Sequence, residues 1–105
     1  MNFIDVTYVH IYFTESDKQL KTLLAKLHNC EKVRGVTVYR AITGFGKSGV
    51  VHSSSLVDLS LDLPLVLEFF DTPDTIERVL NDLEPDIENG HLVCWNARLN
   101  ISTPT

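Results

Sequence analysis

Six segments with regular hydrophobic periodicity follow one another in the order strand, helix, strand, strand, helix, strand. Residues 7–13 are rich in β-branched and aromatic side chains, which are typical of strands. From Ser16 onward, leucines recur at helical spacing and form one apolar stripe. The second half of the chain repeats this pattern. The order predicts an α+β, ferredoxin-like split β-α-β fold (βαββαβ), with two helices on one face of an antiparallel four-stranded sheet.

Local signals place the ends of these segments. Ser16 and Gln19 have the spacing of a capping box, so the first helix is expected to begin at Ser16. Thr72 is a natural N-cap before Pro73, and Pro85 ends or kinks the second helix. The four strands are expected at residues 7–13, 36–43, 63–70 and 92–101.

The segment between the second and third strands, about residues 44–62, is far longer than a hairpin requires. Loops of this length usually serve a function or are mobile. Residues 47–56 are expected to be poorly ordered or variable without a partner, because Gly49 and Ser53–Ser55 can bury little surface.

The first and third strands are apolar on both of their alternating faces. Tyr8 and Tyr12 alternate with Val9 and Ile11, for example, although a half-solvated strand should alternate apolar with polar residues. Two helices cover one face of the sheet, so the other would remain a large exposed patch. The pattern predicts that this face is buried against copies of the same chain, in a closed ring or a dimer.

Composition narrows the possible partners. The 105 residues are expected to form one domain, 1–105. A net charge of −5 argues against a nucleic-acid partner, since Lys and Arg supply most of the affinity for a polyanion. Neither a signal peptide nor an apolar span is apparent, so the cytoplasm is the expected location. Cys30 and Cys94 are expected to be packed or free thiols.

Several longer motifs together resemble the DUF190 family of PII-like proteins. The similar segments are Ile11–Asp17, Tyr39–Gly46, Val51-His52 and Leu59–Pro64, and the resemblance covers nearly the whole chain. It implies a trimer that binds small ligands, commonly adenine nucleotides, in clefts between subunits. It also implies that the loop after the second strand docks on a target, often a membrane transporter; a fluoride exporter is the kind of partner suggested.

The sequence departs from the PII pattern at two places. Gly44-Phe45-Gly46-Lys47-Ser48-Gly49 lacks the glutamine that helps PII proteins to recognise the nucleotide. Before the last strand, Glu88-Asn89-Gly90-His91 replaces a basic, glycine-rich phosphate loop. These changes disfavour a triphosphate and leave a less charged nucleotide, another small anionic metabolite or no ligand as alternatives.

The candidate ligand-binding residues come from the two turns and from charges in the strands. Gly44, Gly46 and Gly49 give backbone freedom, and their N–H groups could form a concavity for an anion. Arg40 pairs with Glu68 in one interpretation and faces the ligand cleft in the other. Together, the candidates are Arg40, Gly44, Phe45, Gly46, Lys47, Ser48, His52, Gly90, His91 and Arg98.

No catalytic constellation is apparent, and Gly46-Lys47-Ser48 lacks the earlier glycine of a Walker motif because Ala41 stands there. The chain is therefore expected not to be an enzyme. Three functions remain open: a ligand sensor, an adaptor that binds its partner without a ligand, and a metal-tolerance trimer of similar fold. His10, His52 and His91 are the candidate ligands for the last, although their spacing matches no known metal motif.

Overall fold

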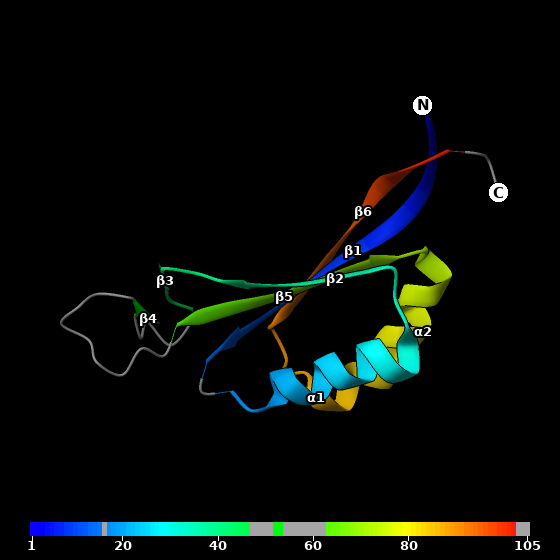
Figure 1. Ribbon diagram of the computed structural model, residues 1–105. Coiled ribbons are helices and arrows are strands. Elements are labelled where there is room, and N and C mark those ends of the chain that lie inside the picture. The colour runs from blue at the N-terminus through cyan, green and yellow to red at the C-terminus, as the bar shows by residue number, and fades with distance from the viewer. Residues whose placement is uncertain (16, 47–51, 54–62, 103–105) are drawn as a thin grey trace.

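The computed structural model describes residues 1–15, 17–46, 52–53 and 63–102. Four strands form an antiparallel sheet in the order β2-β5-β1-β6, and both helices pack on one face of it (Figure 1). The predicted α+β, ferredoxin-like fold is therefore confirmed. In chain order the elements are β1 (Asn2–Thr14), α1 (Gln19–Ala25), the π-helix η1 (Lys26–Glu31), β2 (Gly35–Arg40), β3 (Thr43–Gly44), β4 (His52–Ser53), β5 (Pro64–Asp71), α2 (Pro73–Leu83), the 3-10 turn η2 (Glu84–Asp86) and β6 (Leu92–Ile101).

The core lies between the helices and the two central strands, β1 and β5. Alternate residues of β5 are buried from Leu65 to Asp71, as expected for a strand with one face on a core. Leucines of the first helical segment and the apolar stripe of α2 meet them. The buried cluster is Val9, Ile11, Phe13, Leu23, Leu27, Leu65, Leu67, Phe69, Ile76, Val79 and Leu83.

Strand β1 is longer than the sequence predicted. It begins at Asn2 rather than residue 7, because residues 2–6 pair with residues 97–101 of β6. Strand β5 starts to pair with β1 only at Thr7, so this part of β1 and β6 forms a two-stranded ribbon beyond the sheet (Figure 1). The last strand has the predicted bounds, Leu92–Ile101.

The predicted start of the first helix is wrong. Helix α1 begins at Gln19, and its N-cap residue Lys18 makes no side-chain cap. The carboxylate of Asp17 instead accepts a hydrogen bond from the Gln19 N–H at 2.9 Å. Ser16 lies outside the described residues. The helix then widens into the π-helix η1, which the periodicity did not predict and which ends at Lys32 in the left-handed conformation.

Strand β2 ends at Arg40, three residues earlier than expected. The Ala41 N–H donates to the Pro64 carbonyl at 2.9 Å, but Pro64 has no N–H to return the bond. The ladder therefore stops there, and Thr43–Gly44 pairs with His52–Ser53 as the separate strands β3 and β4. The rest of the predicted loop, 47–51 and 54–62, and with it most of the predicted mobile stretch, lies outside the described residues.

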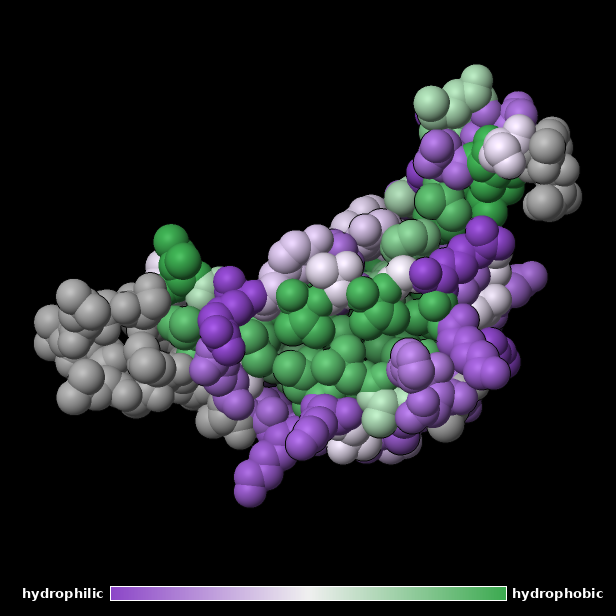
Figure 2. Space-filling model, viewed as in Figure 1, coloured by the Kyte–Doolittle hydropathy of each residue, from purple (hydrophilic) through white to green (hydrophobic). Residues whose placement is uncertain are grey.

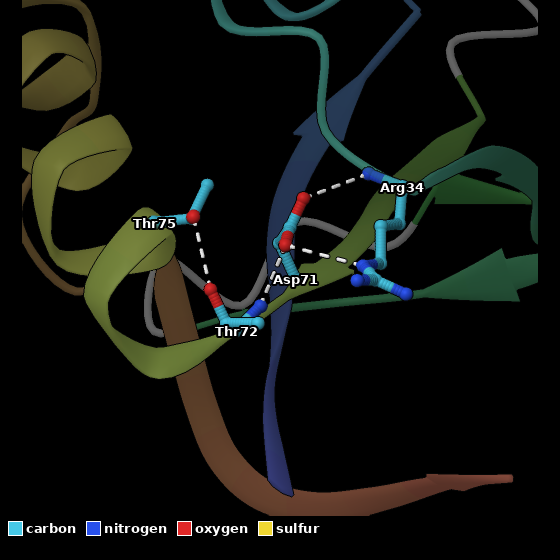
Figure 3. Close-up of polar contacts among 4 residues, drawn as sticks. All are labelled: Arg34, Asp71, Thr72 and Thr75. Atoms are coloured by element: carbon cyan, nitrogen blue, oxygen red, sulfur yellow. Dashed lines mark hydrogen bonds and ion pairs between the residues drawn. The ribbon is translucent and has the colours of Figure 1, made fainter. Parts of the chain in front are cut away.

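The buried carboxylate of Asp71 joins the start of β2 to the start of α2 (Figure 3). Its Oδ2 accepts from the Arg34 backbone N–H at 3.0 Å, and its Oδ1 accepts from the Thr72 N–H at 2.7 Å. The Arg34 side chain adds an ion pair at 3.6 Å. As predicted, Thr72 is the N-cap of α2 and Pro73 follows it, but the Thr72 hydroxyl donates to Thr75 Oγ1 rather than capping the backbone.

Candidate functional site

The side of the sheet that carries no helix is lined with aromatic rings. Residues that pair across strands share a face, and the rows that alternate with the core all point to this side. The Tyr8 ring stacks on Phe70, with centroids 5.2 Å apart, and on Trp95 at 5.3 Å. We call this side the aromatic face; it consists of Tyr8, His10, Tyr12, Tyr39, Val66, Glu68, Phe70, Val93 and Trp95.

The aromatic face is incompletely covered within one chain. Trp95 is 42% exposed, Tyr12 43%, and Tyr39 and Val93 50%. The face extends across all four strands, and contiguous apolar surface of this kind usually marks an interface. The second apolar face of these strands, from which oligomerisation was predicted, is thus exposed in the single chain.

Glu68 is the polar centre of this face. Its Oε1 lies 2.7 Å from His10 Nε2, and the Tyr39 hydroxyl donates to its Oε2 at 3.0 Å. Burial acts to raise the pKa of Glu68, but hydrogen bonds from His10, Tyr39 and Tyr8, with the charge of His10, outweigh it and lower that pKa. Burial and the neighbouring carboxylate of Glu68 raise the pKa of Tyr8. His10 therefore has a hydrogen-bond partner, Glu68, within its own chain.

Arg40 does not pair with Glu68, so that interpretation is wrong. Arg40 lies opposite Leu65, and Glu68 lies opposite Thr37, three residues away along β2. The Arg40 Nε instead lies 2.5 Å from Glu15 Oε1, at the end of β1. The alternating side chains of a strand explain the difference, since residues an odd number of positions apart point to opposite faces.

The glycine turn begins directly after this ion pair. Gly44 pairs with His52 across the β3–β4 ladder, so the backbone of His52 lies beside the predicted glycines. A Cβ at Gly44 would approach Pro64 to 3.1 Å, whereas one at Gly46 would meet nothing within 4 Å. Phe45 between them is 73% exposed. Lys47 and Ser48 lie outside the described residues.

The second predicted turn lies where the chain enters β6. Gly90 has φ of +85°, and it is the one glycine with positive φ among the described residues. The backbone there needs a glycine, whereas the backbone at Gly46 does not. The His91 carbonyl accepts from the Tyr12 N–H at 2.8 Å, and His91 Nδ1 lies 3.0 Å from the Tyr12 carbonyl. His91 Nε2 also lies 3.4 Å from a Glu88 carboxylate oxygen.

Arg98 lies away from both turns. It pairs with Asp5 in the two-stranded ribbon, and its guanidinium lies 4.6 Å from the centre of the Phe3 ring. His91 contacts Tyr12 near the other end of β1. Within one chain, therefore, Arg98 does not join the other candidate residues.

The two turns lie at the same end of the sheet but on opposite edges. Tyr39, next to Arg40, shares a row with Val66 and Tyr12, and Tyr12 bonds to His91. Three strand spacings separate the β2 edge from the β6 edge, or about 14 Å. One chain thus presents each turn at a different edge and does not bring them into a single pocket.

Sequence reasoning missed part of the polar network around these residues. It identified Arg40 and Glu68 as charges in apolar strands but did not identify their partners, Glu15 and the Tyr8–His10–Tyr39 group. Among the described residues, no group of three or more His, Cys, Asp or Glu side chains is arranged to hold a metal ion. The Cys94 thiol is free and exposed. No helix in the described part of the chain is long and apolar enough to span a membrane.

Comparison with known proteins links this geometry to a family. The model of the DUF190 family, described as "Uncharacterized ACR", matches residues 6–99. The chain is 34% identical to the UPF0166 protein MJ1524 of Methanocaldococcus jannaschii over 94 residues, which is 86% of each chain.

Solved structures show the same fold at low identity. CPII of Thiomonas intermedia K12, a nitrogen regulatory PII-like protein bound to ADP, AMP and bicarbonate, has a TM-score of 0.67 at 16% identity and covers 98% of this chain and 93% of its own. The divalent ion tolerance protein CutA1 of Ehrlichia chaffeensis has a TM-score of 0.58 at 8% identity, with coverage of 93% and 84%.

Proposed function

Because the chain belongs to the DUF190 family, we propose that it is a PII-like regulatory protein, and not an enzyme, that senses a small ligand in clefts between its subunits. The ligand class is a small anionic metabolite or an adenine nucleotide. The protein acts as one domain, assembles as a homotrimer in the cytoplasm, and changes the state of a partner when the ligand binds.

The placement of the two turns carries this proposal. Gly44–Gly46 and His91 lie at one end of the sheet on opposite edges, so they can meet only across two chains. The aromatic face would favour association of the chains, because its rings are only half-buried in a single chain. A closed ring would bring the β2 edge of each subunit toward the β6 edge of the next. Arg98 would join such a cleft only from a neighbouring subunit.

The charges near the turns favour a weakly charged anion. Arg40 and His91 supply positive charge, His91 when it is protonated, but Glu15 lies beside the first and Glu88 beside the second. A ligand anion must compete with these carboxylates, which a compact phosphate or carboxylate can do locally. The backbone N–H groups of the Gly44–Gly46 turn would add donors. Phe45, exposed between the glycines, offers a ring on which a base could stack.

The partner is proposed to dock on the segment that follows Gly46. A membrane transporter, such as a fluoride exporter, is the kind of target that the PII-like resemblance suggests. His52 takes part because its backbone pairs with Gly44, so a ligand that moves the glycine turn also moves the start of β4. Lys47 and Ser48 complete the proposed site from the same segment.

Metal tolerance is the second candidate function. One observation favours it, the similarity of the fold to a divalent ion tolerance protein, CutA1. In that case His10, His52 and His91 from several subunits would be the ligands. An adaptor that needs no ligand is the third candidate, and it predicts partner binding without any response to small molecules.

A thermal-shift screen tests the proposal. The pure protein is heated with ADP, AMP, ATP, bicarbonate, Cu²⁺ or Zn²⁺, each in a separate series of concentrations. A ligand present at a hundred times its dissociation constant should stabilise the folded state by about 2.7 kcal/mol. Shifts with ADP, AMP or bicarbonate support the sensor, and shifts with metal ions alone support metal tolerance. No shift with any member contradicts both and leaves the adaptor.

A further inference from the structure

An apolar hollow lies on the opposite side of the molecule from the aromatic face, between the edge strand β2 and the first helical segment. Figure 2 shows a continuous hydrophobic area in this position. Val36 and Val38 contribute to this area. Each is 39% exposed, although they pair with the buried Phe69 and Leu67 and so lie on the core side of the sheet. The helices therefore do not cover the edge strand, and its valines form one wall of an open groove.

The groove contains a cavity of about 480 Å³. This volume lies within the range of about 300–1,000 Å³ that is usual for small-molecule sites. Four aliphatic side chains and two basic ones line it: Leu24, Leu27, Val33, Val36, His28 and Lys32. Ligand sites commonly combine an apolar wall with a few polar groups of this kind.

The backbone at the rim is unusual. The helix widens to a π-helix at Lys26–Glu31, and the Lys32 N–H donates to the Leu27 carbonyl at 2.7 Å. Lys32 has φ of +53°, the one positive value for a non-glycine among the described residues. π-Helices and left-handed side-chain-bearing residues are both enriched at binding sites, where the strain positions a side chain. Here the residue with positive φ is the lysine among the two basic residues that line the cavity.

We propose that this cavity binds an aliphatic carboxylate, with its chain against Leu24, Leu27 and Val36 and its carboxylate at Lys32 and His28. The charge favours an acid over an amine, because both polar lining residues are basic although the chain carries a net charge of −5. The cavity lies at Val36, near the start of β2, whereas the proposed cleft lies beyond the end of that strand, at Gly44–Gly46. It therefore goes beyond the ligand sensing proposed above.

Calorimetric titration with octanoate, below its micellar concentration, tests the site. Octanol and octylamine serve as ligands of the same chain length without the negative charge. Octanoate should bind, and both controls should bind at least about tenfold more weakly because they lack the charge-assisted contact. Absence of octanoate binding, or equal binding of octylamine, would overturn the proposal.

Two variants locate the binding. Lys32→Asn removes the charge while keeping a residue that tolerates the left-handed conformation, and it should weaken octanoate at least about tenfold. Lys21→Gln, at an exposed position of α1 outside the cavity, is the matched control and should leave the affinity unchanged. If Lys32→Asn binds octanoate as tightly as Lys21→Gln, the carboxylate is not at this rim.

Val36→Phe fills the cavity with a residue that strands accept, so it should abolish octanoate binding while the circular dichroism spectrum stays the same. Light scattering is measured on the same sample. A changed oligomer mass would show that the groove is a contact between copies, and unchanged octanoate binding would show that the ligand lies elsewhere; either result overturns the proposal. ADP binding, which is proposed for the cleft between subunits, should be unaffected by Lys32→Asn and by Val36→Phe.

Discussion

Glu68 shows how one side chain links the aromatic face to the stability of the sheet. It accepts hydrogen bonds from His10 and Tyr39 and stands in an otherwise apolar row of β5. An unpaired carboxylate in this position would be costly, because burial disfavours its charge. Hydrogen bonds from His10, Tyr39 and Tyr8 outweigh that cost and hold the pKa of Glu68 below its ordinary value.

Replacing Glu68 with Gln should therefore have a pH-dependent effect. A carboxyl whose pKa is lowered by folding adds stability above its unfolded pKa, near 4.3, and loses it as the pH falls through the folded value. Glu68→Gln should lower the free energy of unfolding by on the order of 1 kcal/mol at neutral pH, and the difference from wild type should shrink in acid. Urea unfolding across a pH series measures this.

The control for this experiment is Glu77→Gln, at an exposed position of α2. A surface substitution of this kind should change the free energy of unfolding little at any pH. If the difference in the free energy of unfolding between wild type and Glu68→Gln were the same at acid and neutral pH, folding would not lower the pKa of Glu68.

Among the elements, β2 depends on a close approach at its first residue. Gly35 lies opposite Phe70 on the aromatic face, and a Cβ there would come within 2.3 Å of the Phe70 ring. The ring lies over the glycine and also stacks on Tyr8. The absence of a side chain at Gly35 thus allows the aromatic row to close over the edge strand.

Gly35→Ala should therefore destabilise the protein by about 1–3 kcal/mol, because the Phe70 ring must move out of its stack. Gly46→Ala is the matched control: its Cβ would meet nothing within 4 Å and its φ is not positive, so a change within about 0.5 kcal/mol is expected. Thermal unfolding of the two variants side by side makes the comparison. Equal destabilisation would mean that the close contact at Phe70 has no energetic weight.

The elements also show what the sequence could predict. Hydrophobic period and turn residues are local signals. They predicted the last strand, the start of α2 at Pro73, and the order of strands and helices along the chain. The first strand was predicted too short, since the polar Asn2 and Asp5 hide a pairing that depends on β6, nearly a hundred residues away. The π-helix η1 and the left-handed Lys32 could not be read from spacing, because both are set by how the helix end packs.

For the whole molecule, the sequence predicted one face without helices, and the structure shows which side chains line it. Candidate residues could be selected by type, but their partners depend on register. Arg40 was paired with Glu68 because both are charges in neighbouring strands, whereas the pleat sends Arg40 to Glu15. The position of each turn relative to a second chain cannot be derived from one sequence, since it depends on how the aromatic faces meet.

A mixing experiment tests the central claim, that the ligand site forms between subunits. Arg40→Ala impairs the β2 edge of the cleft and His91→Ala impairs the β6 edge. The two variants are purified separately, then denatured and refolded together in equal amounts, and ADP binding is measured by calorimetry before and after mixing. Each variant alone should bind ADP at least about tenfold more weakly than wild type. Random mixing pairs an intact β2 edge with an intact β6 edge at about one interface in four, so about a quarter of the wild-type sites should return. A mixture that binds ADP no better than the separate variants would place the site within a single chain and contradict the account.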